Sequence, residues 1–256
     1  MTNPKLCIKI GGRALEEHSV ALELSREIAA LSERYRCVVV HGGGARVSKV
    51  SEHFGLAPKF VDGVRLTSVE EMDVVDMVLR GSVNASLVRM IGARAVGLAG
   101  CDGALFTGLR IAADSHTGRI SEANPALLDL LTKSGYVPIV SSVSVDPERA
   151  ALNINADEAA LAIAVAFHSE YLVFISDIDG VMREGKIIPT MTRESIESAI
   201  EEGVITGGMI PKVRSSVSAL ERGIGSIAIG SFERFGDIEN LIAGRRGSSI
   251  QKEQSS

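Results

Sequence analysis

The segment LCIKIGG, residues 6–12, places one charged side chain, Lys9, in an apolar run and ends that run with two consecutive glycines. A short, continuously apolar run is typical of a strand that is buried on both faces. Gly11 and Gly12 would let backbone N–H groups approach an anion closely and form a concave donor site. The segment therefore predicts a buried strand whose end holds a phosphoryl group. A surface lysine followed by an ordinary glycine turn is the alternative.

The rest of the chain alternates between short apolar runs and segments with helix-type apolar spacing. The runs expected to be strands are LCIKI, CVVVH, AVGLA, YVPIV, YLVFIS and SIAIG. Helices are expected over residues 20–34, 69–79, 84–91, 125–133, 158–167, 194–202 and 211–221. Because the strands are continuously hydrophobic, we predict an α/β fold, a three-layer αβα sandwich with a central, mainly parallel twisted sheet. Hairpins are expected within SVSVDPERAALNIN and MREGKII.

The composition excludes several classes of protein. The chain has 256 residues, of which 45% are hydrophobic, with a mean hydropathy of +0.20 and a net charge of −5. This charge does not favour a nucleic-acid surface, and no apolar run approaches the roughly 20 residues of a membrane span. The first residues lack the apolar core of a signal peptide. Three cysteines and five histidines show no metal-ligand spacing, so we expect a cytoplasmic protein with reduced cysteines and no protein-built metal site.

Two more glycine clusters are predicted to lie at the starts of helices. HGGG, residues 41–44, follows an apolar strand, and Gly207 and Gly208 precede a helix that carries Pro211 and Lys212 in its first turn. The positive end of a helix dipole favours an anion and disfavours a lysine, so a bound anion explains both patterns. Tight turns without a ligand and a solvated lysine are the alternatives. His41 is expected to be a hydrogen-bonded residue at the strand end rather than a general base.

Further polar residues follow other predicted strands. In LNINAD, residues 152–157, Asn153 offers a donor and an acceptor that suit an amide-bearing ligand. Asp157 is either a functional carboxylate or the N-cap of the next helix. The acidic residues of ISDIDGVM, 175–182, either meet lysines or a nucleotide, or cap a turn. Arg65, in VDGVRLTS, is a permanent cation that can bind a carboxylate through two hydrogen bonds.

Taken in order, these segments resemble the amino-acid kinase family, and within it the N-acetylglutamate kinases. The resemblance covers nearly the whole chain. It rests on KIGG, VVVHGGG, VRLTS, GYVPIVSSV, LNINADEAA, ISDIDGV, VITGGMIPKV and RRGSSI. The glycine pairs are weak signals individually, whereas NINADEAA and GGMIPKV at these separations are highly specific.

Matched position by position, the resemblance implies that Lys9 and Lys212 neutralise the transferring phosphoryl group and that Asp157 organises them. It implies that the acceptor is bound by Gly43, Gly44, Arg65 and Asn153. Gly11 and Gly12 match a phosphate cradle. The residues that it implies for adenine-nucleotide binding are Ser176, Asp177, Ile178, Asp179, Gly180, Val181, Val204, Ile205, Thr206, Gly207, Gly208 and Met209.

The reaction implied by the resemblance is ATP-dependent phosphorylation of the γ-carboxylate of N-acetyl-L-glutamate in arginine biosynthesis, with Mg²⁺ on the nucleotide. Residues 1–168 would form a lobe for acceptor binding and dimerisation, and residues 169–256 a lobe for ATP. Since no helix is predicted before the first strand, the chain is similar to the short, arginine-insensitive homodimers of the family.

Two other functions are compatible with the same fold. One is an aminoadipate-type carboxylate kinase acting on a carrier protein, although the chain shows little lysine density near CDGALFTGLR. The other is a non-catalytic sensor, which would not need two lysines and an aspartate around a phosphoryl group. Ala45 and Arg13 depart from residues common in the family, and Arg13 could alter access of the acceptor.

Overall fold

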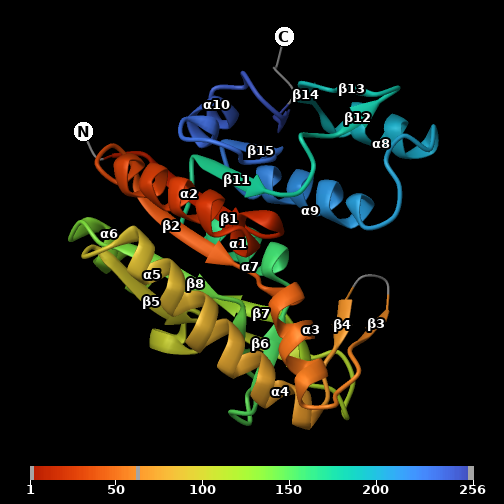
Figure 1. Ribbon diagram of the computed structural model, residues 1–256. Coiled ribbons are helices and arrows are strands. Elements are labelled where there is room, and N and C mark those ends of the chain that lie inside the picture. Colours follow the sequence, from red (N-terminus) through yellow and green to blue (C-terminus); the bar gives the residue numbers. More distant parts are fainter. Residues whose placement is uncertain (1–2, 62–63, 253–256) are drawn as a thin grey trace.

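A computed structural model describes residues 3–61 and 64–252, with the Arg13 side chain outside the described part. Its centre is an eight-stranded sheet (Figure 1). In spatial order the strands are β14 (Thr190–Met191), β16 (Ser248–Ile250), β15 (Ser226–Gly230), β11 (Tyr171–Ile175), β1 (Lys5–Ile10), β2 (Arg36–His41), β8 (Val137–Ser141) and β5 (Ala95–Ala99). All neighbouring pairs are parallel except β15 and β16. The six predicted strands and the mainly parallel sheet are confirmed.

Helices cover both faces of this sheet, which confirms the three-layer sandwich. One face packs against α6 (Ala126–Lys133), α7 (Ala156–Ala166), α8 (Arg193–Glu201) and α9 (Met209–Glu221). The other packs against α2 (His18–Leu31), α4 (Val69–Asp76), η1 (Met77–Asn84), α5 (Ala85–Ile91) and α10 (Asp237–Ile242). The remaining helices are α1 (Arg13–Glu16), α3 (Gly44–His53) and the short η2 (Asp102–Ala104).

The alternation of side chains along β1 decides which face receives its lysine. Leu6, Ile8 and Ile10 are buried in the cluster that contains α2 and α10. Cys7 lies on the opposite face with α7 and α9, and Lys9, two residues on, points the same way. The strand thus presents its charged side chain to α7 and α9.

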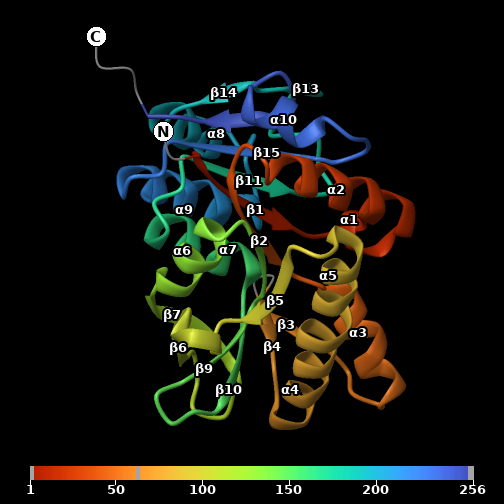
Figure 2. The same cartoon turned by 90° about the vertical axis from the view of Figure 1, so that its left-hand side faces the viewer.

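Smaller sheets surround the central one. A four-stranded sheet has the order β6 (Phe106–Arg110), β7 (Thr117–Ala123), β10 (Ala151–Ile154) and β9 (Val143–Val145), and Figure 2 shows it below the central sheet. Antiparallel pairing of β9 with β10, and of β12 (Met182–Arg183) with β13 (Lys186–Ile187), confirms both predicted hairpins. The sequence prediction missed the β6–β7 pair and the hairpin of β3 (Lys59–Val61) and β4 (Val64–Leu66).

One helix boundary was predicted wrongly. Separate helices were expected over 69–79 and 84–91, but α4, the π-helical η1 and α5 follow one another without interruption. Gly81 disfavours the interior of an α-helix, but the wider π-helical turns carry the chain through this stretch. Among the described residues, no helix is long and apolar enough to cross a membrane.

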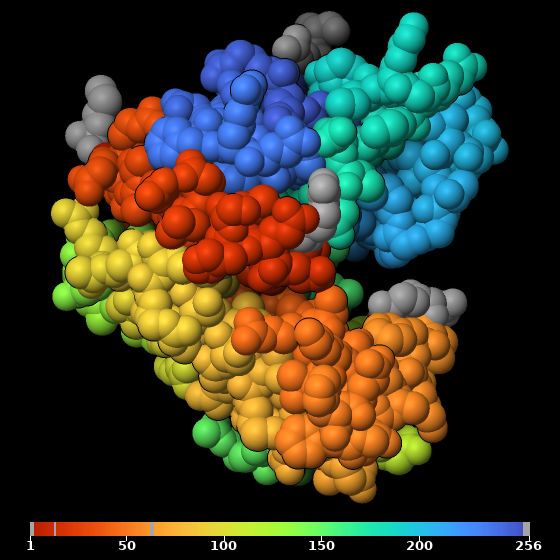
Figure 3. All heavy atoms as spheres, in the orientation of Figure 1, coloured from red at the N-terminus to blue at the C-terminus, as the bar shows by residue number. Residues whose placement is uncertain are grey.

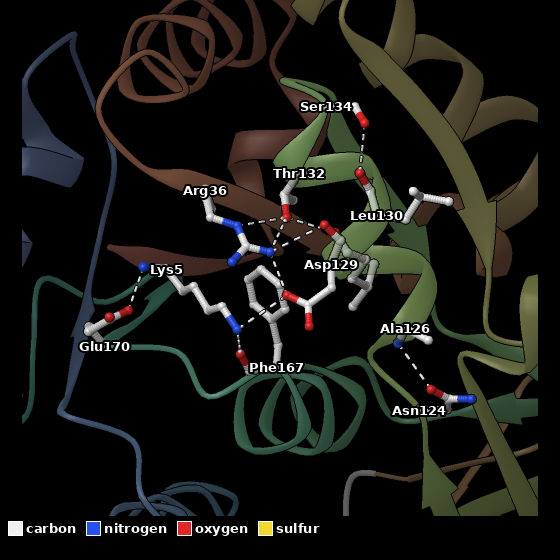
Figure 4. Close-up of polar contacts among 11 residues, drawn as sticks. Lys5, Arg36, Asn124, Ala126, Asp129, Leu130, Thr132, Ser134, Phe167 and Glu170 are labelled. Atoms are coloured by element: carbon white, nitrogen blue, oxygen red, sulfur yellow. Dashed lines mark hydrogen bonds and ion pairs between the residues drawn. The ribbon is translucent and has the colours of Figure 1, made fainter. Parts of the chain in front are cut away.

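The amino-terminal ends of β1 and β2 are tied together by a charged cluster (Figure 4). Asp129 of α6 pairs with Arg36 and, at 3.3 Å, with the Lys5 ammonium. Lys5 also donates to the Phe167 carbonyl at 2.7 Å and lies over its ring. Arg36 donates to the Thr132 hydroxyl as well. These contacts stabilise the end of the sheet opposite to the glycine loops.

Candidate active site

One carboxylate bridges two ammonium groups at the carboxyl end of β1. Asp157 Oδ1 lies 2.8 Å from Lys9 Nζ, and its Oδ2 lies 3.1 Å from Lys212 Nζ. The lysines come from β1 and α9, more than 200 positions apart in the sequence, and each side chain is only 14% exposed. The structure therefore brings together the three residues predicted to act on a phosphoryl group.

Local structure explains how Asp157 is free to make these pairs. Asn155 caps α7, because its side-chain oxygen accepts from the N–H groups of Asp157 at 2.8 Å and Glu158 at 3.3 Å. The alternative in which Asp157 is the N-cap is therefore wrong. Asp157 lies in the first turn of α7, where the helix dipole also favours its negative charge.

The charges of this cluster depend on one another. Burial acts to raise the pKa of the Asp157 carboxyl, but the neighbouring Lys9 and Lys212 ammonium groups outweigh it and lower the pKa below its ordinary value. Lys212 lies in the first turn of α9, where the dipole opposes a cation, and its ammonium group stands 5.5 Å from the centre of the Phe174 ring. An anion between the lysines would thus meet concentrated positive charge.

The first glycine loop leaves room for charged groups. A Cβ atom on Gly11 would stand 2.7 Å from Lys9 Nζ, so a side chain there would displace the ammonium group. Gly12 has φ of +58°, and a Cβ on it would overlap the Asp177 carboxylate. A side chain at either glycine of KIGG would therefore move a charged group of the site.

The second glycine loop lies beside the first. Gly42 N–H donates to the carbonyl of Ile10 at 3.1 Å, and Ala156 of α7 lies next to Gly42. α3 begins at Gly44, so the backbone N–H groups of its first turn have no partner within the helix. Both loops thus open at the same end of the sheet, beside Asp157.

Arg65 is held rigidly near the second loop. Its side chain is 7% exposed and pairs with Glu71 at 2.6 Å. It also donates to the Gly44 carbonyl at 3.0 Å and to the hydroxyl of Ser48. The guanidinium that was predicted to bind a carboxylate is thus anchored to a carboxylate of its own chain.

Asn153 belongs to the same neighbourhood. Its amide donates to Thr67 Oγ1 at 2.9 Å. The Thr117 hydroxyl accepts from Thr67 N–H and donates to the Arg65 carbonyl. Two of the residues predicted to bind the acceptor, Arg65 and Asn153, are therefore connected through Thr67 and Thr117.

The residues predicted to bind the nucleotide form two segments. Residues 176–181 follow β11, and residues 204–209 connect α8 to α9. Ser176 N–H donates to the Gly230 carbonyl at 2.9 Å, and Val181 N–H donates to Ser248 Oγ at 2.8 Å. In the second segment, Met209 N–H donates to the Thr206 carbonyl at 3.2 Å as α9 begins. The first segment is thus fixed against the ends of β15 and β16.

A groove of about 870 Å³ opens at the two glycine loops and separates α1 from α3. It is lined by Gly12, Leu15, Glu16, Gly43, Gly44, Ala45, Arg46, Lys49, Val50, His53, Val83 and Asp177. Figure 3 also shows the surface hollowed between the orange N-terminal segment and the cyan C-terminal segment. Small molecules can therefore approach the loops from solvent.

Sequence reasoning missed several residues that shape this site. Glu71 lies in the first turn of α4, where an acidic residue is usually a solvated helix-start charge. Asn84 begins the predicted helix 84–91 and so has the pattern of an N-cap, but it is buried. Arg246 lies in the quoted RRGSSI, and it donates to Ser231 Oγ at 2.7 Å beside Asp179. The only signal for Asn84 in the sequence was a polar residue between apolar ones, Val83 and Leu87, in a predicted helix.

Comparisons with known proteins agree with this geometry. Residues 4–231 match the Amino acid kinase family. An acetylglutamate kinase from Chlorobaculum parvum is 39% identical over 228 residues, covering 86% of this chain and 75% of that protein. One from Solibacter usitatus is 37% identical over 246 residues, covering 94% and 96%. The structure of an N-acetylglutamate synthase from Neisseria gonorrhoeae superposes with a TM-score of 0.85 at 22% identity, covering 98% of this chain and 60% of that one, and shows a shared fold.

Proposed function

This chain belongs to the amino acid kinase family, and from that premise we propose that it transfers the γ-phosphoryl group of ATP to the γ-carboxylate of N-acetyl-L-glutamate. The observation that carries the proposal is the Asp157 carboxylate between the Lys9 and Lys212 ammonium groups. The relatives named acetylglutamate kinase support the choice of acceptor.

For this phosphoryl transfer the protein needs mainly to align the two reactants and to stabilise negative charge. An oxygen of the acceptor carboxylate forms a bond to the γ-phosphorus, and the bond from that phosphorus to the β,γ-bridging oxygen breaks, which releases ADP. Because a carboxylate is already a nucleophile, no general base is needed. Catalysis then rests on holding the two reactants in line and on stabilising the charge that spreads over the phosphoryl oxygens.

Different residues bind the transferring phosphoryl group, the acceptor and the nucleotide. Lys9 and Lys212 neutralise the transferring group, and Asp157 keeps their ammonium groups close together until that group arrives. The N–H groups of Gly11 and Gly12 receive phosphate oxygens, as glycine loops do in other phosphate sites. Gly43, Gly44, Arg65 and Asn153 hold the acceptor, and the segments 176–181 and 204–209 hold the nucleotide.

Mg²⁺ would enter with the nucleotide. Within the described part of the chain, no group of three or more His, Cys, Asp or Glu side chains is placed to hold an ion. Mg²⁺ is commonly held by substrate phosphates and water, with few protein ligands. Bound there, it would neutralise charge on the β- and γ-phosphates.

The proposal extends to the setting of the enzyme. It includes a role in arginine biosynthesis, a homodimer, and a cytoplasmic location, which suits the three free cysteines. Residues 1–168 would bind the acceptor and form the dimer, and residues 169–256 would bind ATP. Size measurement of the purified protein tests the dimer.

Trapping of the acyl phosphate with hydroxylamine tests the reaction. The purified protein, ATP and Mg²⁺ should give hydroxamate with N-acetyl-L-glutamate and little with glutamate or aminoadipate. Preference for aminoadipate would move the chain to the carrier-linked carboxylate kinases. Binding without phosphoryl transfer to any of the three would identify a sensor instead.

A further inference from the structure

A buried asparagine connects the π-helical segment η1 to the strand that carries the second glycine loop. Asn84 is 4% exposed, and its Nδ2 lies 2.7 Å from the Ile139 carbonyl, 3.0 Å from His41 Nε2 and 3.3 Å from the Leu98 carbonyl. A Cβ on Gly97 would stand 2.2 Å from Asn84 Oδ1, so only glycine admits the amide. The amide nitrogen is a donor only, and its two hydrogens are shared among these three acceptors.

The asparagine fixes the chemical form of the His41 ring. Since the Asn84 nitrogen donates to Nε2, the ring hydrogen resides on Nδ1, which donates to the Gly42 carbonyl at 2.8 Å. His41 is completely buried, and burial lowers its pKa to about 4, so the ring is neutral at physiological pH. The expectation of a hydrogen-bonded strand-end histidine is thus confirmed, with a defined tautomer.

The same helical segment also supports the next residue of the loop. Gly43 has φ of +149°, and a Cβ on it would lie 2.9 Å from Leu79 Cδ2 and 3.1 Å from Val83 Cγ2. Both side chains belong to η1. Gly42 is therefore held through His41, while Gly43 rests directly on the π-helical turns.

We propose that η1 and His41 form a positioning unit for the second glycine loop, in which Asn84 fixes the ring, the ring fixes Gly42, and Leu79 and Val83 seat Gly43. The unit keeps the N–H groups of Gly43 and Gly44 oriented toward the bound acceptor. This inference rests on the proposed function. Asn84 and His41 touch no reacting atom and act as positioning residues. π-Helical turns are frequently found at functional sites.

Asn84→Ala should raise KM for N-acetyl-L-glutamate about tenfold, the effect of losing roughly one hydrogen bond's contribution to orientation. KM for ATP should stay close to the wild-type value, because η1 packs mainly against α3, α4, α5, β5 and β8 and not against the elements that flank the nucleotide segments. His41→Phe should raise the same KM, and the double variant should add little to either single change, since both act through one connection.

Leu87→Ala is the matched control. Leu87 is a buried core residue of α5, three positions from Asn84, with no role in the connection. Its truncation should lower stability while leaving KM for N-acetyl-L-glutamate unchanged. An equal rise in KM for Leu87→Ala and Asn84→Ala would show a general packing effect and overturn the inference.

Nitrogen-15 NMR of the histidine rings tests the connection without any assay of activity. Wild-type His41, assigned by through-bond correlation of its ring to its own backbone in the labelled protein, should show a single neutral tautomer protonated at Nδ1, and Asn84→Ala should populate both tautomers. A wild-type ring protonated at Nε2 would overturn the inference even if no variant folds. A wild-type protein that does not phosphorylate N-acetyl-L-glutamate would instead remove the proposed function, and the ring nitrogens would still test the connection.

Discussion

Lys212 carries a positive charge at a place where its own helix opposes one, and Asp157 compensates for it. If its charge acts on the transferring group, Lys212→Ala should lower kcat by roughly 10²–10³, the usual cost of removing one such donor. Initial rates of hydroxamate formation measure this effect. Lys186→Ala is the control, because Lys186 is exposed on the β12–β13 hairpin. A kcat near that of wild type for Lys212→Ala would contradict the assignment.

Asp157 should also leave a signature in the pH dependence of stability. Its folded-state pKa is lowered by the two lysines despite burial, so its contribution to stability is present above the unfolded value of about 3.8 and is lost as pH falls through the lower folded value. Asp157→Asn should therefore be less stable than wild type at pH 7, and this difference should shrink as the solution is acidified below pH 4. Urea unfolding at a series of pH values measures it, and a difference independent of pH would count against the ion pairs.

At the residue scale the sequence predicted the charged groups better than their partners. Lys9, Asp157 and Lys212 could be chosen because each lies beside glycines or a helix start in a specific motif. Nothing in the pattern indicated that Asn155, two residues earlier, would cap α7 and release Asp157. Glu71 and Asn84 were missed for a related reason, since burial of a polar side chain depends on segments that are distant in the sequence.

At the scale of elements, the pair of Arg65 and Glu71 joins the β3–β4 hairpin to α4. Both side chains are buried, at 7% and 6% exposed. Glu71→Gln leaves a buried cation without its counter-charge, which typically costs about 3–5 kcal/mol of unfolding free energy. Denaturant unfolding measures this loss. Glu197→Gln, which removes an exposed pair with Arg214, should leave the unfolding free energy nearly unchanged. Equal effects from the two substitutions would show that burial does not matter here.

The strands of the central sheet were predictable because burial on both faces leaves a continuous apolar signal. The β3–β4 hairpin was not, because all three residues of β3 are exposed and carry no such signal. The joined helices α4, η1 and α5 were predicted as two helices from apolar spacing, because π-helical turns do not follow the 3.6-residue period. The conformation of such segments depends on tertiary contacts, which the local sequence does not reveal.

At the scale of the whole molecule, the carboxyl end of the central sheet holds the candidate active site, and the amino-terminal end holds a charged cluster that stabilises the fold. Asp129 lies at the amino-terminal end, where Arg36 and Lys5 lower the pKa of its carboxyl although partial burial acts to raise it. Asp129→Asn should lower the urea midpoint at pH 7 and leave both KM values unchanged, because the reacting groups lie at the other end. Steady-state kinetics beside unfolding curves measure both effects. A raised KM would show that the ends are coupled.

The unbroken passage from α4 through η1 to α5 has a consequence for how this gene tolerates length changes. Each π-helical turn holds about one residue more than an α-helical turn, so removing one residue from 77–84 would let a wide turn close as an α-helix. The flanking helices α4 and α5 would keep their phase, but Leu79, Val83 and Asn84 could no longer all face the second glycine loop. Single-codon deletions in this stretch, even at the exposed Gly81, should therefore leave the fold in place and disturb the loop.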